Sequence, residues 1–231
     1  MNYKYKWILF DADGTLFNYD KSEQHALYKA FKNYGVDFNS VYLAQYRQIN
    51  HFLWGELEKG KINSEKLRVE RFEILLKEIN CNLNAKLLSD SYLNELSQTD
   101  FMLEGAIEIL EFLFGKVNLA IITNGIKFVQ EGRLKKSKIE KYFKEIIISE
   151  DVKIAKPDKL FFDYTLEKIN FKNKSEILIV GDSLTSDIQG GINSDIDTCW
   201  FNPNKNGNIL SFNPTFEIVN LSEIEKIISN N

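Results

Sequence analysis

Six short apolar runs, each followed by polar or turn residues, constrain the fold of this chain more than any other feature. Their sequences, in chain order, are YKWILF, VNLAIIT, EIIIS, EILIVG, DTCWF and TFEIV. Each has the length of a β-strand and is rich in β-branched or aromatic residues. The apolar residues are continuous rather than alternating, which is typical of strands that are covered on both faces.

Helical patterns lie between these predicted strands. The segments EGAIEILEFLFG and PDKLFFDYTLEKIN carry apolar residues at helical spacing, and a shorter pattern, TSDIQGGINS, follows the fourth strand. Pro157 is expected at the first helical position of the second segment. Strands that alternate with helices predict βαβ units. We therefore expect an α/β fold with a Rossmann-like parallel sheet and helices on both faces.

The segment from residue 19 to residue 98 interrupts this alternation. Four amphipathic helical patterns occupy it, at residues 22–35, 39–60, 63–80 and 84–98, and no strand pattern is found. Ser or Asn precedes several of them as a candidate N-cap. We therefore predict a catalytic core of residues 1–18 plus 99–231, with an all-helical cap, residues 19–98, inserted after the first strand.

Composition limits the partners and the compartment. The chain has 231 residues and a net charge of -4, which disfavours a nucleic acid polymer as partner. Its two cysteines, Cys81 and Cys199, are far apart, so a reducing cytosol fits better than a disulfide framework. We find no signal-peptide pattern and no run approaching the roughly 18 apolar residues of a membrane span. These features predict a cytoplasmic protein without a membrane partner, and its oligomeric state stays open.

Polar side chains follow four of the predicted strands. In parallel sheets the carboxyl ends of the strands meet at one edge, where ligands bind. Several acids meeting there would repel one another, and a divalent cation would relieve that repulsion. Carboxylates, together with phosphate and water, suit Mg²⁺. In strand order, the candidate site residues are Asp11, Asp13, Thr123, Asn124, Lys156, Asp182 and Asp187.

The residue types at this edge suggest phosphoryl transfer. The Asp11 carboxylate can attack phosphorus and form an aspartyl-phosphate. Lys156 and Mg²⁺ would screen the repulsion between that carboxylate and the phosphate. Asp13 can protonate the leaving oxygen and then accept a proton from the attacking water.

The ordered motifs resemble those of the haloacid dehalogenase superfamily of phosphotransferases. The matching residues are Asp11-Ala12-Asp13-Gly14-Thr15, Thr123-Asn124-Gly125, Lys156-Pro157, and Gly181-Asp182 with Ser186-Asp187. The resemblance covers essentially the whole chain, and the helical insert matches the family's cap in its earlier insertion site. An acid at Asp13 resembles the phosphatases, because the dehalogenases that gave the superfamily its name lack one there.

This resemblance implies a role for each matching residue. It implies that Asp13 binds Mg²⁺ through its backbone carbonyl, that Asp182 is a direct or near-direct ligand, and that Asp187 supports the metal shell. Asp11 is then both nucleophile and metal ligand. The implied phosphate-binding residues are Thr123, Asn124 and Lys156.

Longer segments look like the bacterial pyrimidine-type 5'-nucleotidase branch of the superfamily. They include QINHFLWGELEKGKIN in the insert and ILIVGDSLTSDIQGGINSDIDTCWFN in the core. The resemblance implies hydrolysis of nucleoside 5'-monophosphates, with a house-cleaning role against non-standard nucleotides. Phe52 and Trp54 could offer a surface for a base, although cap core is the more usual fate of such residues.

Other functions stay open at this point. A sugar-phosphate phosphatase or phosphomutase would use the same core chemistry. A phospho-accepting receiver domain also uses Asp, Thr, Lys and Mg²⁺, but its chain is usually much shorter and has no such insert. An inactive binding protein on this fold is disfavoured by the intact set of acids.

Two residues depart from the pattern of the relatives. Lys153 stands where they usually have Gly, and it could add a second cation near the phosphate or point to solvent. Asp195 also stands where Gly is frequent. Asp tolerates left-handed backbone better than most residues, so we expect Asp195 to affect stability alone.

Overall fold

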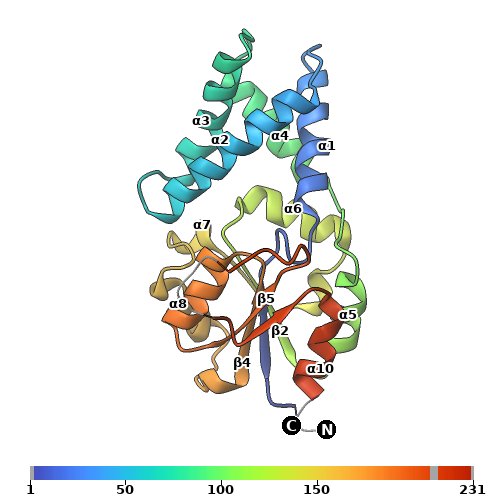
Figure 1. Ribbon diagram of the computed structural model, residues 1–231, viewed down its shortest axis with the longest axis vertical. Coiled ribbons are helices and arrows are strands. Elements are labelled where there is room, and N and C mark those ends of the chain that lie inside the picture. The colour runs from blue at the N-terminus through green and yellow to red at the C-terminus, as the bar shows by residue number, and fades with distance from the viewer. Residues whose placement is uncertain (1–2, 209–212, 230–231) are drawn as a thin grey trace. The chain divides into compact units, whose positions relative to one another are not determined.

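The computed structural model describes residues 3–208 and 213–229, which divide into two compact units (Figure 1). The first, here called the sheet unit, contains the chain up to Asn18, Phe101–Lys127 and the chain from Ser137 onward. The second, here called the helical unit, contains Tyr19–Asp100 and Phe128–Lys136. Besides the inserted segment, the helical unit thus includes a short piece of chain from beyond the second strand.

The sheet unit is built on six parallel strands in the order β3-β2-β1-β4-β5-β6. The predicted α/β class and parallel sheet are confirmed, because all six apolar runs form strands of this one sheet. The central strand β1 pairs with β2 on one side and β4 on the other, so Leu9 lies between Ala120 and Ile179. The strands are β1 Trp7–Phe10, β2 Asn118–Thr123, β3 Glu145–Ile148, β4 Ile177–Gly181, β5 Asp197–Phe201 and β6 Phe216–Ile218.

Continuous apolar sequence buries both faces of the central strands. Leu9 and Ile179 belong to a buried cluster that also contains Phe161 and Phe162 of helix α8 (Lys159–Lys168). Helices α5 (Ala106–Leu113) and α10 (Ile224–Ser229) lie on the opposite side of the sheet from α8 (Figure 1). The shorter elements of this unit are η1 Glu140–Tyr142, α7 Ser149–Val152, η2 Lys174–Glu176, η3 Leu184–Ile188, α9 Gln189–Asn193 and η4 Leu221–Glu223.

The predicted start of α8 at Pro157 is wrong. The helix begins at Lys159, and the Asp158 side chain caps it by accepting a hydrogen bond from the backbone N–H of Leu160 at 2.9 Å. Asp is among the strongest N-cap residues, and a cap lies just outside the helix. Pro157 therefore belongs to the turn that follows Lys156.

Lys153 and Asp195 both adopt a left-handed backbone conformation. Lys153 ends α7 with φ 60° and is exposed, and Asp195 has φ 56°. Glycine adopts this conformation without strain, which accounts for its frequency at such positions. The left-handed turn expected at Asp195 is confirmed.

The helical unit contains the four predicted helices of the insert, α1 (Tyr19–Lys32), α2 (Ser40–Glu58), α3 (Ser64–Glu78) and α4 (Ala85–Ser97). Asparagine caps three of them. The side chains of Asn39, Asn63 and Asn84 accept hydrogen bonds from backbone N–H groups of the first turns of α2, α3 and α4. The prediction of Asn caps is confirmed for these three helices.

Helix α6 (Lys127–Ser137) was not anticipated from the sequence, and most of its residues belong to the helical unit. Its segment is rich in Lys and contains Gly132, so its apolar periodicity is weak. A Cβ at Gly132 would lie 2.7 Å from the carbonyl oxygen of Ser97, at the end of α4. The glycine therefore allows α6 to pack closely against the end of α4.

No helix in the described part of the chain combines the length and the apolar character needed to cross a membrane.

Candidate active site

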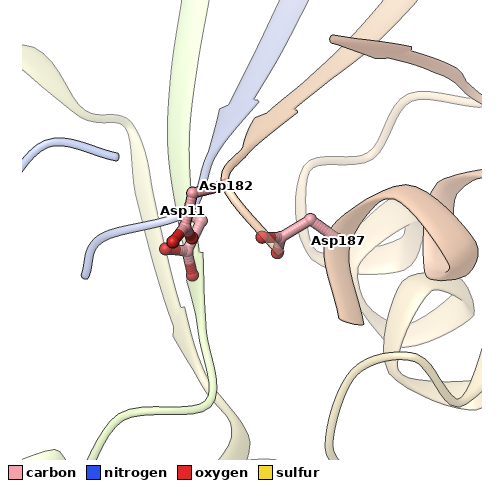
Figure 2. Close-up of side chains that lie close together, drawn as sticks. All are labelled: Asp11, Asp182 and Asp187. Atoms are coloured by element: carbon pink, nitrogen blue, oxygen red, sulfur yellow. The ribbon is translucent and has the colours of Figure 1, made fainter. Parts of the chain in front are cut away.

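Three aspartates meet at the carboxyl ends of the central strands (Figure 2). Asp11 follows β1, Asp182 follows β4, and Asp187 lies in the short helix η3. Each contributes a carboxylate oxygen to a group whose members lie within 4.8 Å of one another. Asp11 and Asp187 are buried, whereas Asp182 is exposed as a residue. The sheet thus brings together three of the acids predicted to share this edge.

Two glycines make room for these carboxylates. Gly14 has φ 85°, and a Cβ at this position would collide with the carboxyl group of Asp182. A Cβ at Gly181 would collide with the carboxyl group of Asp187 in the same way. Both glycines therefore leave the space that the carboxyl groups occupy. Gly14 also adopts the left-handed conformation that the turn after β1 requires.

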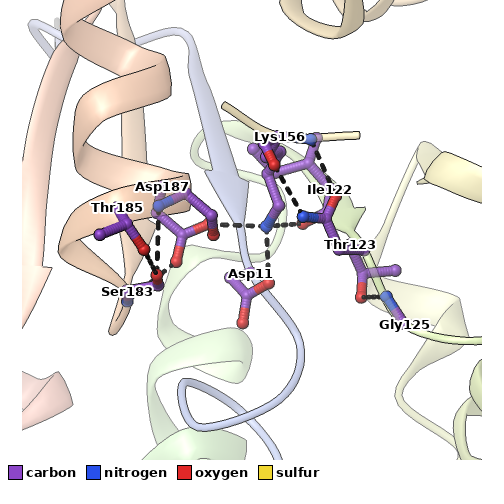
Figure 3. A network of polar contacts seen from close by, with 10 residues as sticks. Asp11, Ile122, Thr123, Gly125, Lys156, Ser183, Thr185 and Asp187 are labelled. Carbon is purple, nitrogen blue, oxygen red and sulfur yellow. Dashed lines mark hydrogen bonds and ion pairs between the residues drawn. The ribbon is translucent and has the colours of Figure 1, made fainter. Parts of the chain in front are cut away.

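Lys156 joins two of the acids (Figure 3). Its Nζ donates hydrogen bonds to Asp11 Oδ1 at 2.7 Å, to Asp187 Oδ1 at 2.6 Å and to the carbonyl oxygen of Ile122 at 2.7 Å. The three donors of the ammonium group therefore each have an acceptor. The side chain is 1% exposed, so this cation is fixed in position.

The charges at this edge do not balance. Three carboxylates lie beside one ammonium group, and the pKa values of two of them, Asp11 and Asp182, are raised. Burial raises the pKa of Asp11 to about 7; Lys156 opposes that rise, and Asp187 adds to it. Burial of its carboxyl group, and then repulsion from Asp11 and Asp187, raise the pKa of Asp182. Burial by itself would lower the pKa of Lys156, but the two carboxylates hold it above its usual value. An additional cation bound at the cluster would therefore be electrostatically favourable.

Asn124 holds the backbone of Lys156. Its Nδ2 donates to the Lys156 carbonyl and its Oδ1 accepts from the Lys156 N–H, both at 2.9 Å. The amide side chain is thus occupied in positioning the lysine, a role that the sequence did not suggest. The neighbouring Thr123 is buried, and its hydroxyl accepts a hydrogen bond from the N–H of Gly125 at 2.9 Å (Figure 3).

Asp13 lies in the turn after β1, outside the group of three acids. The turn is closed by hydrogen bonds from the N–H groups of Leu16 and Phe17 to the carbonyl oxygen of Ala12. Asp13 is half-buried there. It is therefore more open to solvent than Asp11, two residues earlier.

Two further residues, which were not predicted from the sequence, donate hydrogen bonds to the acids. The N–H of Ser183 donates to Asp187 Oδ2 at 3.1 Å, and the indole N–H of Trp200 donates to the carbonyl oxygen of Asp182 at 2.9 Å. Ser183 directly follows Asp182 in the sequence, so its place beside the acids could have been predicted. Trp200 comes from β5, and only the pairing of the strands reveals its role.

A family model described as haloacid dehalogenase-like hydrolase matches residues 8–201, a span that contains every predicted site residue. This chain belongs to that family. The predicted family, and with it the prediction of an enzyme of the hydrolase class, is confirmed.

Individual relatives in the family match almost the full chain. The pyrimidine 5'-nucleotidase YjjG of Escherichia coli is 35% identical, covering 97% of this chain and 98% of its own. The pyrimidine 5'-nucleotidase PynA of Streptococcus pneumoniae is 36% identical, covering 98% of this chain and 96% of its own. A crystal structure of the HAD-hydrolase YfnB of Bacillus subtilis bound to magnesium superposes with a TM-score of 0.92 at 36% identity, covering 97% of this chain and 98% of that one.

Proposed function

We propose that this protein is a Mg²⁺-dependent phosphomonoester hydrolase that acts on nucleoside 5'-monophosphates. The observation that carries the proposal is the buried Asp11 carboxylate, hydrogen-bonded by Lys156 and lying within one group with Asp182 and Asp187. A nucleophilic carboxylate needs cations around it before a phosphate dianion can approach. This cluster supplies one cation and the ligands for another.

Asp11 is the proposed nucleophile. One oxygen of its carboxylate attacks phosphorus, an aspartyl-phosphate forms, and the bond to the ester oxygen breaks. Asp13, two residues on, gives its proton to that leaving oxygen and then takes a proton from the water that hydrolyses the intermediate. Lys156 stabilises negative charge on Asp11 and on the transferred phosphoryl group throughout.

The donor set fits Mg²⁺. The three carboxylates of Asp11, Asp182 and Asp187 provide oxygen ligands in close proximity, and only one ammonium group, that of Lys156, lies among them. Mg²⁺ prefers such oxygen ligands together with phosphate and water. Bound there, it would neutralise charge on the phosphate. Asp13 is proposed to contribute its backbone carbonyl.

Phosphate oxygens are proposed to bind at the end of β2. The buried Thr123 hydroxyl and the backbone around Asn124 are the proposed contacts, with Lys156 as the cation. Because the Asn124 side chain is held by Lys156, its part in phosphate binding would come from its backbone and from fixing the lysine.

The preferred substrate class rests on the relatives. Two relatives at 35–36% identity over nearly the whole chain are named pyrimidine 5'-nucleotidases, which favours a nucleoside monophosphate and, within that class, a pyrimidine. A sugar-phosphate phosphatase or phosphomutase remains the alternative on the same core. The helical unit is the proposed cap, which would close over the substrate and exclude water. The cytoplasm is the proposed compartment.

A screen of phosphate release tests the function. Purified protein with Mg²⁺ would be offered pyrimidine and purine nucleoside 5'-monophosphates, several sugar phosphates and an aryl phosphate. We expect phosphate release from the aryl phosphate and the highest kcat/KM with pyrimidine nucleotides. Highest activity with a sugar phosphate would overturn the substrate assignment, and no release from any of them would overturn the function.

A further inference from the structure

Asn or Asp directly precedes Gly at three places in this chain, which are Asp13-Gly14, Asn124-Gly125 and Asn206-Gly207. Such a pair can react internally, because the backbone nitrogen of the glycine can attack the side-chain carbonyl carbon of the residue before it. Glycine has no Cβ to hinder that attack. The first two pairs belong to the candidate active site, whereas the third lies in the loop that follows β5 and has no part in the chemistry proposed above.

The two pairs at the candidate active site are restrained by hydrogen bonds. The N–H of Gly14 donates to the carbonyl oxygen of Phe17 at 3.0 Å, and the N–H of Gly125 donates to the hydroxyl of Thr123 at 2.9 Å. Both ends of the Asn124 amide are also held, by hydrogen bonds to the backbone of another segment. A nitrogen whose proton is already donated and an amide that cannot turn are poorly placed to react with each other.

The third pair has neither restraint. Asn206 and Gly207 are both exposed. Within residues 3–208 and 213–229, neither the side chain of Asn206 nor the N–H of Gly207 has a hydrogen-bond partner. A Cβ built on Gly207 would meet no atom within 4 Å. The attacking nitrogen and the carbonyl carbon are therefore free to approach each other, and there is space around them for the ring that they would form.

Asn202 holds the backbone of Asn206 without contacting the reacting atoms. Its Oδ1 accepts from the N–H of Asn206, and its Nδ2 donates to the carbonyl oxygen of Asn206, both at 2.9 Å. That carbonyl belongs to the peptide bond whose nitrogen would attack. Because negative charge spreads onto the carbonyl oxygen when the nitrogen loses its proton, the donor from Asn202 stabilises the attacking form. Asn202 is 2% exposed, and its Nδ2 also donates to Glu217 of β6 at 2.7 Å, so the donor is fixed in position.

We propose that Asn206 is a modification site, at which the side-chain amide is lost through reaction with the backbone of Gly207 while Asn124 is preserved by the fold. The Gly207 nitrogen gives its proton to water and forms a bond to Cγ of Asn206. The bond between Cγ and Nδ2 breaks, and Nδ2 leaves as ammonia. Water then opens the cyclic imide, at Cγ to give aspartate or at the backbone carbonyl carbon to give isoaspartate.

The reaction requires no reagent besides water and does not depend on the proposed phosphatase activity. Nothing is oxidised or reduced, because an amide is exchanged for a carboxylate. Both products therefore carry a negative charge where the neutral amide of Asn206 stood. Isoaspartate also lengthens the backbone at this position, next to the contacts with Asn202. These two changes make the products detectable by ion exchange and by peptide mapping.

Peptide mapping by mass spectrometry tests the site. The folded full-length protein would be incubated at mildly alkaline pH, and samples would be digested at intervals. We expect aspartate and isoaspartate to accumulate at Asn206, while Asn124 keeps its amide over the same period. An Asn206 amide that persists as long as the Asn124 amide would overturn the inference.

Gly207→Ala tests the attack by the backbone nitrogen. The added methyl group fits the open space at this position but hinders the approach of the nitrogen to the side chain. The reaction at Asn206 should slow about tenfold or more, which corresponds to about 1.4 kcal/mol in its activation free energy. Gly55→Ala is the matched control, because Gly55 also has no atom within 4 Å of an added Cβ but follows Trp54. It should leave the rate unchanged, and an unchanged rate in Gly207→Ala would contradict the mechanism.

Unfolding tests whether the fold protects Asn124. In concentrated guanidinium chloride the hydrogen bonds of Asn124 and Gly125 are lost, and each of the two Asn-Gly pairs is then an exposed peptide segment. We expect Asn124 to react at a rate similar to that of Asn206 under these conditions. If Asn124 stayed much slower in the unfolded chain, the neighbouring sequence rather than the fold would account for the difference, and the protection inferred from the structure would be refuted.

Discussion

The two aspartates of the first motif differ in their surroundings, and their proposed tasks differ accordingly. Asp11 is 7% exposed and held by Lys156, as suits a nucleophile that must keep one orientation. Asp13 is half-buried in the turn that follows, where it can exchange protons with water. The buried position and fixed contact of Asp11 thus distinguish the proposed nucleophile from Asp13, the proposed proton shuttle.

Asp13→Ala tests this division of labour. A general acid contributes about 10²- to 10⁴-fold to a rate, but only where the leaving oxygen needs a proton. Nucleotide hydrolysis should therefore slow by much more than hydrolysis of p-nitrophenyl phosphate, whose leaving group is stable as an anion. The measurement is kcat/KM for both esters. An equal loss on both would argue against a general acid.

Single residues were predictable where chemistry alone marked them. Charged groups after buried strands stand out because they need partners. In the structure Lys156 pairs with Asp11 and Asp187, and Asp182 lies in the same group of carboxylates. The Asn124 side chain was less predictable, because its partner is a backbone 32 residues away that only folding brings near. The placement of Phe52 in the core of the cap is wrong, since this ring is 61% exposed.

At the scale of elements, the turn after β1 decides where the carboxyl group of Asp182, a proposed metal ligand, can lie. Gly14 has a left-handed φ and leaves the space that the Asp182 carboxyl group fills. Any side chain there must strain the backbone and displace the acid.

Gly14→Ala should therefore remove most Mg²⁺-dependent activity, in addition to a loss of about 1–2 kcal/mol in the free energy of unfolding from the left-handed backbone. Gly35→Ala is the matched control, because Gly35 has φ 69° and no atom within 4 Å of an added Cβ. It should lose similar stability and keep activity. Denaturant unfolding and phosphate release from both variants provide the measurement, and equal activities would contradict the steric account.

Elements were predictable in proportion to their apolar pattern. The six strands were found because each is a continuous apolar run, and α1 to α4 because their apolar residues follow helical spacing. Helix α6 was not predicted, because its sequence is rich in lysine and has few apolar residues, and it packs through Gly132. The start of α8 was misplaced because Pro157 and Asp158 both signal a helix start, and the side-chain cap at Asp158 decides it.

At the scale of the whole molecule, the sheet unit should gain stability from Mg²⁺. A ligand at a hundredfold excess over its Kd stabilises the folded state by about 2.7 kcal/mol. For a chain of this size that corresponds to a rise in Tm of roughly 5–10 °C. We expect this rise on adding Mg²⁺, and we expect EDTA to abolish both the rise and the hydrolysis of an aryl phosphate.

Asp182→Asn should diminish the rise in Tm, because it removes one of the three carboxylates. Asp163→Asn, which changes an acid that pairs with Lys159 on α8, should leave it intact. Thermal unfolding with and without Mg²⁺ reports both. Hydrolysis that continues unchanged in EDTA would mean that the reaction does not require Mg²⁺.

The prediction of an inserted helical segment rests on one feature of the sequence, a stretch of helical patterns that interrupts an otherwise regular alternation of strands and helices. What the sequence could not reveal is that residues 128–136 group with the helical unit. That grouping depends on the packing of Gly132 against Ser97 and on a hydrogen bond from Arg133 to Ser22, two contacts between distant parts of the chain.

Asp11→Asn tests the central claim most directly, because it replaces the nucleophilic oxygen with an amide of nearly the same shape. The measurement is phosphate release from uridine 5'-monophosphate and from an aryl phosphate, in the presence of Mg²⁺, with thermal unfolding to verify the fold. We predict a folded protein that releases no detectable phosphate from either ester. A folded Asp11→Asn variant that still turns over either ester would contradict the assignment of Asp11 as the nucleophile.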